Sequence, residues 1–206
     1  MTKPRTRLRR VAWPVACLLA TAALTAAQAP KTVQPLSAEQ RRTLLQTAMK
    51  DERVVAFAKG QRVRAVSVST EEVDKDGEPS IVAVAVVMNY GTGQAVRVRM
   101  APDTGRVESV EPLPGRPQSS AEERQEAEAI LKGAPDVAPL LSGNAILRGG
   151  FVVDAPAGAA ATGRYLEYHI VTPDGRSFVA EVIVDLATKR VAQVRRAESD
   201  DKRGGA

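Results

Sequence analysis

Alternating apolar and polar residues predict a strand pair in the middle of the chain. Residues 96–100 read Val-Arg-Val-Arg-Met, a period of two that places apolar side chains on one sheet face and guanidinium groups on the other. Residues 102–105, Pro-Asp-Thr-Gly, supply turn chemistry, and a second strand pattern follows at 106–110. The pattern predicts a β-hairpin over residues 94–110.

Much of this hairpin recurs near the C-terminus. The stretches 98–110 and 182–194 align without gaps and share five residues, at positions 84 apart. A second match lies at the helical end, where Ser-Ala-Glu-Gln-Arg at 37–41 returns as Ser-Ala-Glu-Glu-Arg at 120–124, 83 positions later. A spacing of this size predicts duplication of a domain-sized folding unit.

The first unit, residues 36–112, begins with a helix pattern. Ser37 and Gln40 fit a capping box, in which each residue's side chain accepts a hydrogen bond from the backbone of the other. Apolar residues at helical spacing follow and restart beyond Asp51. We expect a helix with a kink at this residue, or a short second helix.

Strands complete the first unit. They are predicted at 63–70, at 81–88 and in the hairpin, with a charged loop at 71–80. Residues 81–88, Ile-Val-Ala-Val-Ala-Val-Val-Met, are apolar at every position, which predicts burial on both faces. We expect the second face of this strand to pack against the other unit or, as a homodimer, against a second copy of the chain.

The second unit, residues 120–196, repeats this plan after a Pro/Gly linker at 113–119. Ser120 and Glu123 form a second capping box, and the helix is expected to break at 133–135, Gly-Ala-Pro. Its strands are predicted at 145–153, 164–171, 177–184 and 190–195. The charged stretch 197–206 is predicted to be a disordered tail.

The element order predicts an α+β fold. Each of the two tandem units has a kinked helix followed by about four antiparallel strands, an arrangement typical of a helix packed on a curled sheet.

The N-terminus has the pattern of a bacterial signal peptide, residues 1–29. Five basic residues precede an uncharged core at 11–27, and cleavage is predicted after Ala27 or Ala29. The Sec route is favoured over the twin-arginine route, and a retained membrane anchor is the alternative. The prediction is a secreted or extracytoplasmic protein.

Removal of this segment changes the charge and the thiol content of the protein. It holds five of the 29 basic residues and none of the 24 acidic ones, so the remainder carries no net charge. The basic composition therefore does not indicate a nucleic acid or, after cleavage, a membrane as partner. Cys17, the only cysteine, is lost as well, which excludes a disulfide in the mature chain.

Four short motifs resemble the N-terminal domains of copper amine oxidases. They are Asp-Thr-Gly-Arg-Val at 103–107, Glu-Pro-Leu-Pro-Gly at 111–115, the acidic helix at 121–131, and Pro-Asp-Val at 135–137. Those domains are small cystatin-like α+β domains, usually in tandem. The resemblance covers about residues 36–196 and implies two cystatin-like units.

The catalytic chemistry of that family is not expected here. It resides in a large C-terminal domain, with a tyrosine-derived quinone beside copper held by three histidines. Asn89-Tyr90-Gly91 is similar to the tyrosine motif, but Gly91 stands where the acidic residue belongs, so we interpret it as a strand end entering a turn. His169 is the only histidine, which excludes a three-imidazole copper site within one chain.

Other catalytic or metal motifs are equally incomplete. A Ser-His-Asp triad would depend on His169, which the strand pattern places beside Glu167 on a solvent-facing surface. Asp74 and Asp76 with Gly77 have too few ligands for an EF-hand loop.

Charged side chains also have structural interpretations. Carboxylates on the second helix favour its dipole and solubility, and two strand arginines suit a solvated face better than an anion site. The carboxylates are Glu122, Glu123, Glu126 and Glu128, and the arginines are Arg97 and Arg99. We therefore predict no catalytic, cofactor-binding or metal site.

The sequence predicts a non-catalytic exported protein that presents sheet or hairpin surfaces to an exported protein partner. A regulator or inhibitor of an exported peptidase is the alternative, because cystatin-like units also occur in inhibitors and propeptides. A small enzyme with a pocket between helix and sheet is the least favoured hypothesis.

Overall fold

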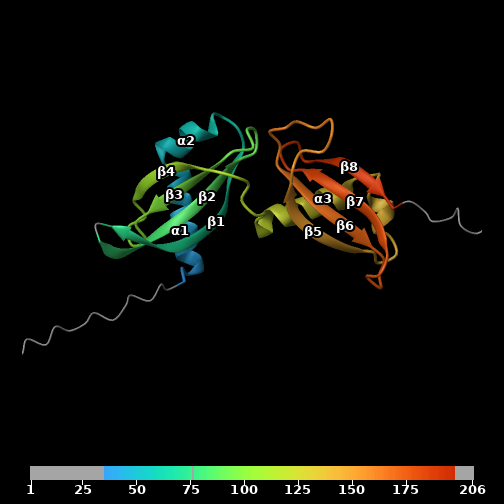
Figure 1. Cartoon of the computed structure of the whole chain (residues 1–206), viewed down its shortest axis with the longest axis horizontal. Coiled ribbons are helices and arrows are strands. Elements are labelled where there is room, and N and C mark those ends of the chain that lie inside the picture. The colour runs from blue at the N-terminus through green and yellow to red at the C-terminus, as the bar shows by residue number, and fades with distance from the viewer. Residues whose placement is uncertain (1–34, 76, 198–206) are drawn as a thin grey trace, which may run out of the picture. The chain divides into compact units, whose positions relative to one another are not determined.

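The computed structural model describes residues 35–197 except Asp76. These residues lie in one compact unit and contain two four-stranded antiparallel sheets, each with its strands in sequence order (Figure 1). The predicted α+β fold, two successive units of helix and sheet, is confirmed. The predicted signal peptide and residues 198–206 of the predicted tail lie outside the described residues. No helix in the described part of the chain is long and apolar enough to cross a membrane.

The first lobe contains two helices and the sheet β1–β4. Its elements are α1 (Ala38–Lys50), α2 (Glu52–Ala58), β1 (Val63–Lys75), β2 (Glu78–Asn89), β3 (Ala95–Met100) and β4 (Val107–Leu113). The last strand thus extends to the first residue of the predicted linker.

Side-chain caps define the two helices of the first lobe. Ser37 Oγ accepts a hydrogen bond from the Gln40 amide at 3.1 Å, and Gln40 Oε1 accepts one from the Ser37 amide at 2.8 Å. Asp51 ends α1 and caps α2, because its carboxylate accepts a hydrogen bond from the Arg53 amide. The predicted capping box is confirmed, and of the two alternatives at Asp51 the chain forms the short second helix.

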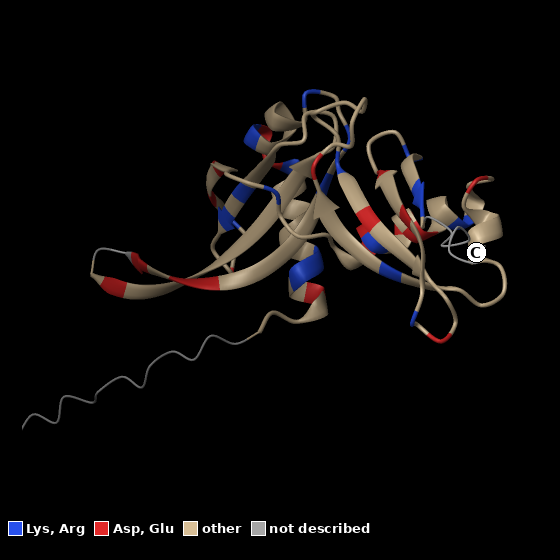
Figure 2. Ribbon diagram, turned by 45° about the vertical axis from the view of Figure 1, so that its right-hand side comes forward, with Lys and Arg blue, Asp and Glu red and all other residues tan. Residues whose placement is uncertain are grey.

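The predicted loop at 71–80 is instead the distal half of a long β-hairpin. Pairing continues from Glu71 opposite Val82 as far as the last residues of β1 and the first of β2. A tight turn containing Gly77, which has a positive φ of 82°, closes the hairpin. In the ribbon of Figure 2, Asp and Glu residues are red along this hairpin. The loop prediction was wrong because cross-strand pairing holds this charged segment in the strand state.

Strand β2 is buried on both faces, as predicted. Ala83, Ala85 and Val87 belong to the core between helices and sheet, while Val82 and Val84 on the other face are 4% and 2% exposed.

Neighbouring strands bury this second face. Val84 lies opposite Arg99 and Val86 opposite Arg97, and the Nε atoms of both arginines are buried. Long arginine stems cover apolar surface in this way. Met88 packs in a small cluster with residues of the same sheet. Neighbouring strands of its own sheet therefore contribute to the cover of this face, and the chain buries Val82 and Val84 without a second copy.

The second lobe contains one α-helix, a 3₁₀ helix and the sheet β5–β8. Its elements are α3 (Ala121–Gly133), η1 (Ala138–Leu141), β5 (Ile146–Val153), β6 (Tyr165–Val171), β7 (Phe178–Asp185) and β8 (Arg190–Arg196). The predicted capping box of Ser120 and Glu123 is present, and α3 ends at the predicted break. Its apolar side packs on one face of the sheet, around Leu131, Leu166 and Val182.

A glycine pair bends the edge strand of this sheet. Gly149 has a φ of 137° and Gly150 one of 84°, and the pairing of β5 with β6 shifts register there. A Cβ atom added to Gly149 would lie 2.5 Å from the Glu167 carbonyl oxygen. The bulge thus requires glycine for both conformation and space.

We expect Gly149→Ala to lower the free energy of unfolding by more than Gly143→Ala, in a urea titration. Both positions have positive φ, but a Cβ atom at Gly143 meets nothing within 4 Å, so only the backbone cost of about 1–2 kcal/mol applies there. Equal losses of unfolding free energy in the two variants would show that a Cβ atom at Gly149 causes no steric clash.

Candidate functional site

A buried ion pair lies at the start of α3. Glu123 and Arg164 have side chains that are 0% and 1% exposed, and they form two hydrogen bonds of 3.0 Å, from Nε to Oε1 and from Nη2 to Oε2. Burial by itself would raise the pKa of Glu123, but the hydrogen bonds and charge of Arg164 hold that pKa below its usual value. The carboxylate therefore stays ionised inside the protein.

Tyr90 connects the first lobe to this ion pair. Its ring packs in the core of the second lobe, and its hydroxyl donates a 2.8 Å hydrogen bond to Glu123 Oε1. Arg62 stacks on the ring, 4.5 Å from its centroid. Burial, together with the charge of Glu123, raises the pKa of Tyr90 far above its usual range. The tyrosine is a neutral structural anchor.

The motif at residues 89–91 is a strand end entering a turn, as predicted. Asn89 is the last residue of β2, and its amide nitrogen donates to the Phe57 and Ala58 carbonyls of α2. Its Oδ1 accepts hydrogen bonds from the Gly91 and Thr92 amides. These contacts orient the neighbouring tyrosine.

Two carboxylates of α3 have larger roles than the sequence indicated. The buried Glu123 was expected to favour the helix dipole and solubility. Glu126 accepts hydrogen-bonded or ionic contacts from Arg62, Arg64 and Lys189. Glu122 and Glu128 remain at the surface. The helix therefore contributes to the junction of the two lobes.

The outer face of the second sheet carries the single imidazole. His169 lies beside Glu167 on the face opposite the core, as predicted, with 3.0 Å between His169 Nε2 and Glu167 Oε1. Glu181 on β7 lies opposite His169 in the strand register. One ligand atom from each side chain lies within 4.8 Å of the other two. We call these three residues the His169 cluster.

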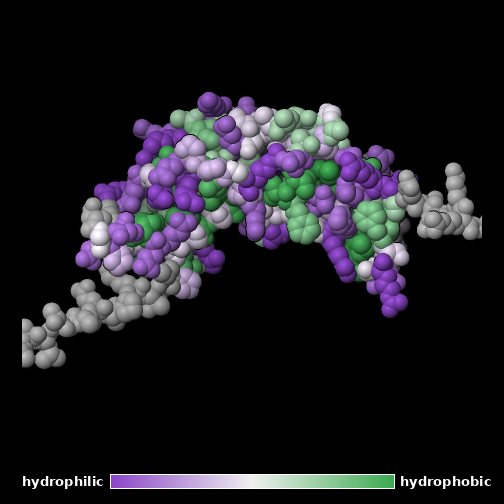
Figure 3. All heavy atoms as spheres, in the orientation of Figure 1, coloured by the Kyte–Doolittle hydropathy of each residue, from purple (hydrophilic) through white to green (hydrophobic). Residues whose placement is uncertain are grey.

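Two phenylalanines lie exposed on the same sheet. Phe151 is 63% exposed and Phe178 is 46% exposed, and the Phe178 ring meets the His169 ring edge-on at 5.6 Å. In Figure 3, hydrophobic surface shows over this lobe among hydrophilic atoms. His169 contacts Glu167 through a hydrogen bond and Phe178 through its ring. Neither partner is a serine or cysteine nucleophile, so these contacts do not form a catalytic triad.

A groove of about 750 Å³ lies between α1 and β1. It is lined mainly by arginines and small or apolar side chains: Ala38, Arg41, Arg42, Leu45, Gln46, Arg64, Ala65, Val66, Ser67, Val68 and Glu122. Strand β1 is an edge of its sheet and pairs only with β2 in the described residues.

The charge of this groove is mostly positive. Arg41 and Arg42 are exposed and have no acidic partner within the described part of the chain, whereas Arg64 pairs with Glu126 at 3.0 Å. One further nitrogen of Arg64, Nη1, is buried without a hydrogen-bond partner. The groove thus combines an open strand edge with unneutralised guanidinium groups.

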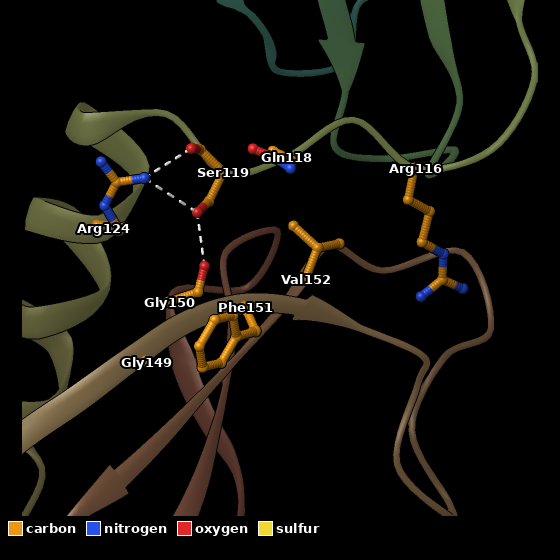
Figure 4. A pocket seen from close by; sticks show the side chains of 8 residues that line it. All are labelled: Arg116, Gln118, Ser119, Arg124, Gly149, Gly150, Phe151 and Val152. Carbon is orange, nitrogen blue, oxygen red and sulfur yellow. Dashed lines mark hydrogen bonds between the residues drawn. The ribbon is translucent and has the colours of Figure 1, made fainter.

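A second pocket, of about 460 Å³, lies between the start of α3 and the β5 bulge (Figure 4). Its polar groups bind one another. Arg124 donates hydrogen bonds to the Ser119 carbonyl and hydroxyl, and the Ser119 hydroxyl donates to the Gly150 carbonyl. Arg116 pairs with Asp154 at 3.0 Å. These contacts make the pocket a structural joint.

The remaining charged residues named in the sequence analysis do not come together in a common site. Arg99 pairs with Glu111 at 3.2 Å, on the sheet face where Arg97 also lies. Asp74 accepts a hydrogen bond from the Gly77 amide, so it shapes the hairpin turn, and Asp76 lies outside the described residues.

Comparison with known proteins identifies a fold but no family. No known protein family and no curated protein matches the sequence. Among solved structures, the fold is similar to that of a copper-containing benzylamine oxidase from Hansenula polymorpha, with a TM-score of 0.53 and 10% sequence identity. The match covers 81% of this chain and 30% of the oxidase chain. At this identity the similarity shows a shared fold.

Proposed function

We propose that this chain is an exported, non-catalytic interaction protein whose α1–β1 groove binds an extended acidic segment of an exported protein. The observation that carries the proposal is the open edge of β1 beside Arg41 and Arg42. An edge strand presents unpaired backbone groups to which an extended segment can add as a further strand.

Charge complementarity sets the chemistry of the partner. The two exposed arginines lie one after the other on α1, and Arg64 faces them from β1. Carboxylates of a bound segment would meet guanidinium groups on both walls, while Leu45 and Val66 would contact its apolar side chains. Such charges steer association and fix the register of binding.

The fold supports a non-catalytic role. The similar region is a minor part of the oxidase chain, and fold alone does not carry chemistry. The proposal therefore rests on the groove, and the shared fold supplies only the scaffold.

The experiment is a capture from the secreted or envelope fraction of the native host, with the protein as bait and a photo-crosslinking residue in place of Gln46. We expect capture of a partner crosslinked through an acidic, extended segment. The double variant Arg41→Glu/Arg42→Glu should lower its recovery by at least about tenfold, which corresponds to about 1.4 kcal/mol.

The matched control reverses two exposed arginines of the second lobe, Arg176→Glu/Arg196→Glu. Equal losses in both double variants would reduce the effect to net charge and refute the groove. A crosslinked segment without acidic residues would also refute the proposed groove. If the partner is a peptidase whose activity falls on binding, the regulatory alternative replaces an accessory role.

A further inference from the structure

We propose that the His169 cluster, Glu167, His169 and Glu181, binds a divalent transition-metal cation of the Zn²⁺ type. The inference is independent of the groove, because the cluster lies on the outer face of the other sheet. It rests on three different side chains that bring one ligand atom each to within 4.8 Å of the other two.

Strand register brings the three side chains together. Glu167 and His169 are two residues apart on β6, so they point to the same face. Glu181 lies directly across from His169 on β7. Directly opposed residues hold their Cβ atoms about 4.5–5.5 Å apart. The arrangement is therefore fixed by backbone pairing.

The positions are also rigid. Strands β6 and β7 are the two central strands of their sheet. Tyr168 and Val182, which alternate with the proposed ligands, are 2% and 0% exposed. Packing of these residues in the core prevents the outer side chains from shifting register. A metal site needs this kind of support from the scaffold.

The distances suit a small cation. His169 Nε2 and Glu167 Oε1 are 3.0 Å apart. Zn²⁺ binds nitrogen and oxygen ligands at about 2.0–2.2 Å in tetrahedral geometry, so two of its ligand atoms lie about 3.3–3.6 Å apart, and the His169–Glu167 pair has to open by only a few tenths of an ångström. One ligand atom of Glu181 lies within 4.8 Å of a ligand atom of each of the other two side chains. Half-exposure of the cluster leaves room for water as the fourth ligand.

The ligand set selects the class of cation. One imidazole and two carboxylates suit Zn²⁺ and neighbouring transition metals. Ca²⁺ prefers six to eight oxygen ligands, and Mg²⁺ prefers an octahedral oxygen shell. The two carboxylates also balance the charge of a divalent cation.

Neighbouring groups tune the site. Arg195 on β8 donates a 3.2 Å hydrogen bond to Glu181, so it competes with a cation for this carboxylate. Arg148 lies opposite His169 on β5 and adds positive charge to the same face. The Phe178 ring meets the imidazole edge-on and restricts its orientation. A cation must therefore displace Arg195, which predicts tighter binding when that arginine is removed.

The test is a Zn²⁺ titration of the whole chain followed by calorimetry and NMR. The protein is produced without a histidine tag, and Cys17→Ser removes the one thiol that would compete for Zn²⁺. Because the chain has a single histidine, its imidazole ¹⁵N signals are unambiguous. We expect one equivalent of Zn²⁺ to bind and to shift the His169 Nε2 signal.

Variants distinguish this site from general surface binding. His169→Ala and Glu181→Gln should each weaken Zn²⁺ binding more than about tenfold, since even the loss of a group that only orients a metal ligand costs about 10–100-fold. Arg195→Gln should tighten it. The matched control is Glu111→Gln, which removes a carboxylate paired with an arginine at the same distance of 3.2 Å on the first sheet. The control should bind Zn²⁺ like the parent.

Three outcomes would overturn the proposal. One is an absence of Zn²⁺ binding, and another is binding that leaves the imidazole signals in place. The third is an equal loss in Glu181→Gln and Glu111→Gln. A Ca²⁺ titration that matches the Zn²⁺ affinity would reject the assigned class of cation.

Discussion

Replacing Arg164 with Met is expected to lower the free energy of unfolding by about 3–5 kcal/mol, because it leaves the Glu123 carboxylate buried without its counter-ion. Both side chains are essentially inaccessible, and Arg164 also donates to the carbonyls of Pro117 and Gln118 before α3. The measurement is a urea titration followed by circular dichroism. The loss is larger than that expected for any surface ion pair of the molecule.

Arg195→Met is the matched control. Its pair with Glu181 is 61% exposed on the arginine side, so its removal should cost less than about 1 kcal/mol. The double variant Glu123→Leu/Arg164→Met should recover part of the loss, since no unpaired charge remains. A loss below about 1 kcal/mol for Arg164→Met would show that this pair is not buried in solution.

The same pair gives the variant a distinctive pH profile. In the parent, folding lowers the pKa of Glu123 from its ordinary value of 4.5, so its stabilising contribution is present above about this pH and declines as the pH falls through the folded pKa. In Arg164→Met, the charge and hydrogen bonds of Arg164 no longer offset burial, and protonation of Glu123 relieves the unpaired charge. The stability difference between parent and variant should therefore shrink in acid.

Local patterns predicted most of the fold. The alternation in β3 and the two capping boxes depend on neighbouring residues, and these features formed where the sequence placed them. The β1–β2 hairpin shows the limit of such reasoning. Its distal half is charged, and the strand state there follows from cross-strand pairing, such as that of Glu71 with Val82.

Neither the ion pair nor the complete His169 cluster could be predicted in this way, because Arg164 is far in sequence from Glu123, and Glu181 is far from Glu167 and His169. Glu123 has the spacing of a helix cap and fulfils that role, so nothing in its position indicated a second bond to Arg164. Glu181 alternates with Ala180 and Val182, which predicts an outward side chain. Its position opposite His169 required the register of β6 with β7.

Replacing Tyr90 is also expected to cause a large loss in the free energy of unfolding. It follows a strand of the first lobe, but its ring packs in the core of the second. Tyr90→Ala removes the ring, its hydrogen bond to Glu123 and the stacking surface of Arg62. We expect the free energy of unfolding to fall by about 3–5 kcal/mol in a urea titration, as for other large-to-small core changes.

The location of the effect distinguishes this tyrosine from an ordinary core residue of its own lobe. Met100 is 0% exposed in the first core, so Met100→Ala should reduce amide hydrogen-exchange protection in β2 and β3. Tyr90→Ala should reduce this protection in β6 and β7 as well. Tyr90→Phe keeps the ring, so its free energy of unfolding should fall by only about 1.5–3 kcal/mol, through loss of the hydrogen bond to the carboxylate. Unchanged protection in the second sheet of Tyr90→Ala would show that the two lobes do not share this side chain. A shared side chain means instead that the second lobe is complete only when the first supplies its tyrosine.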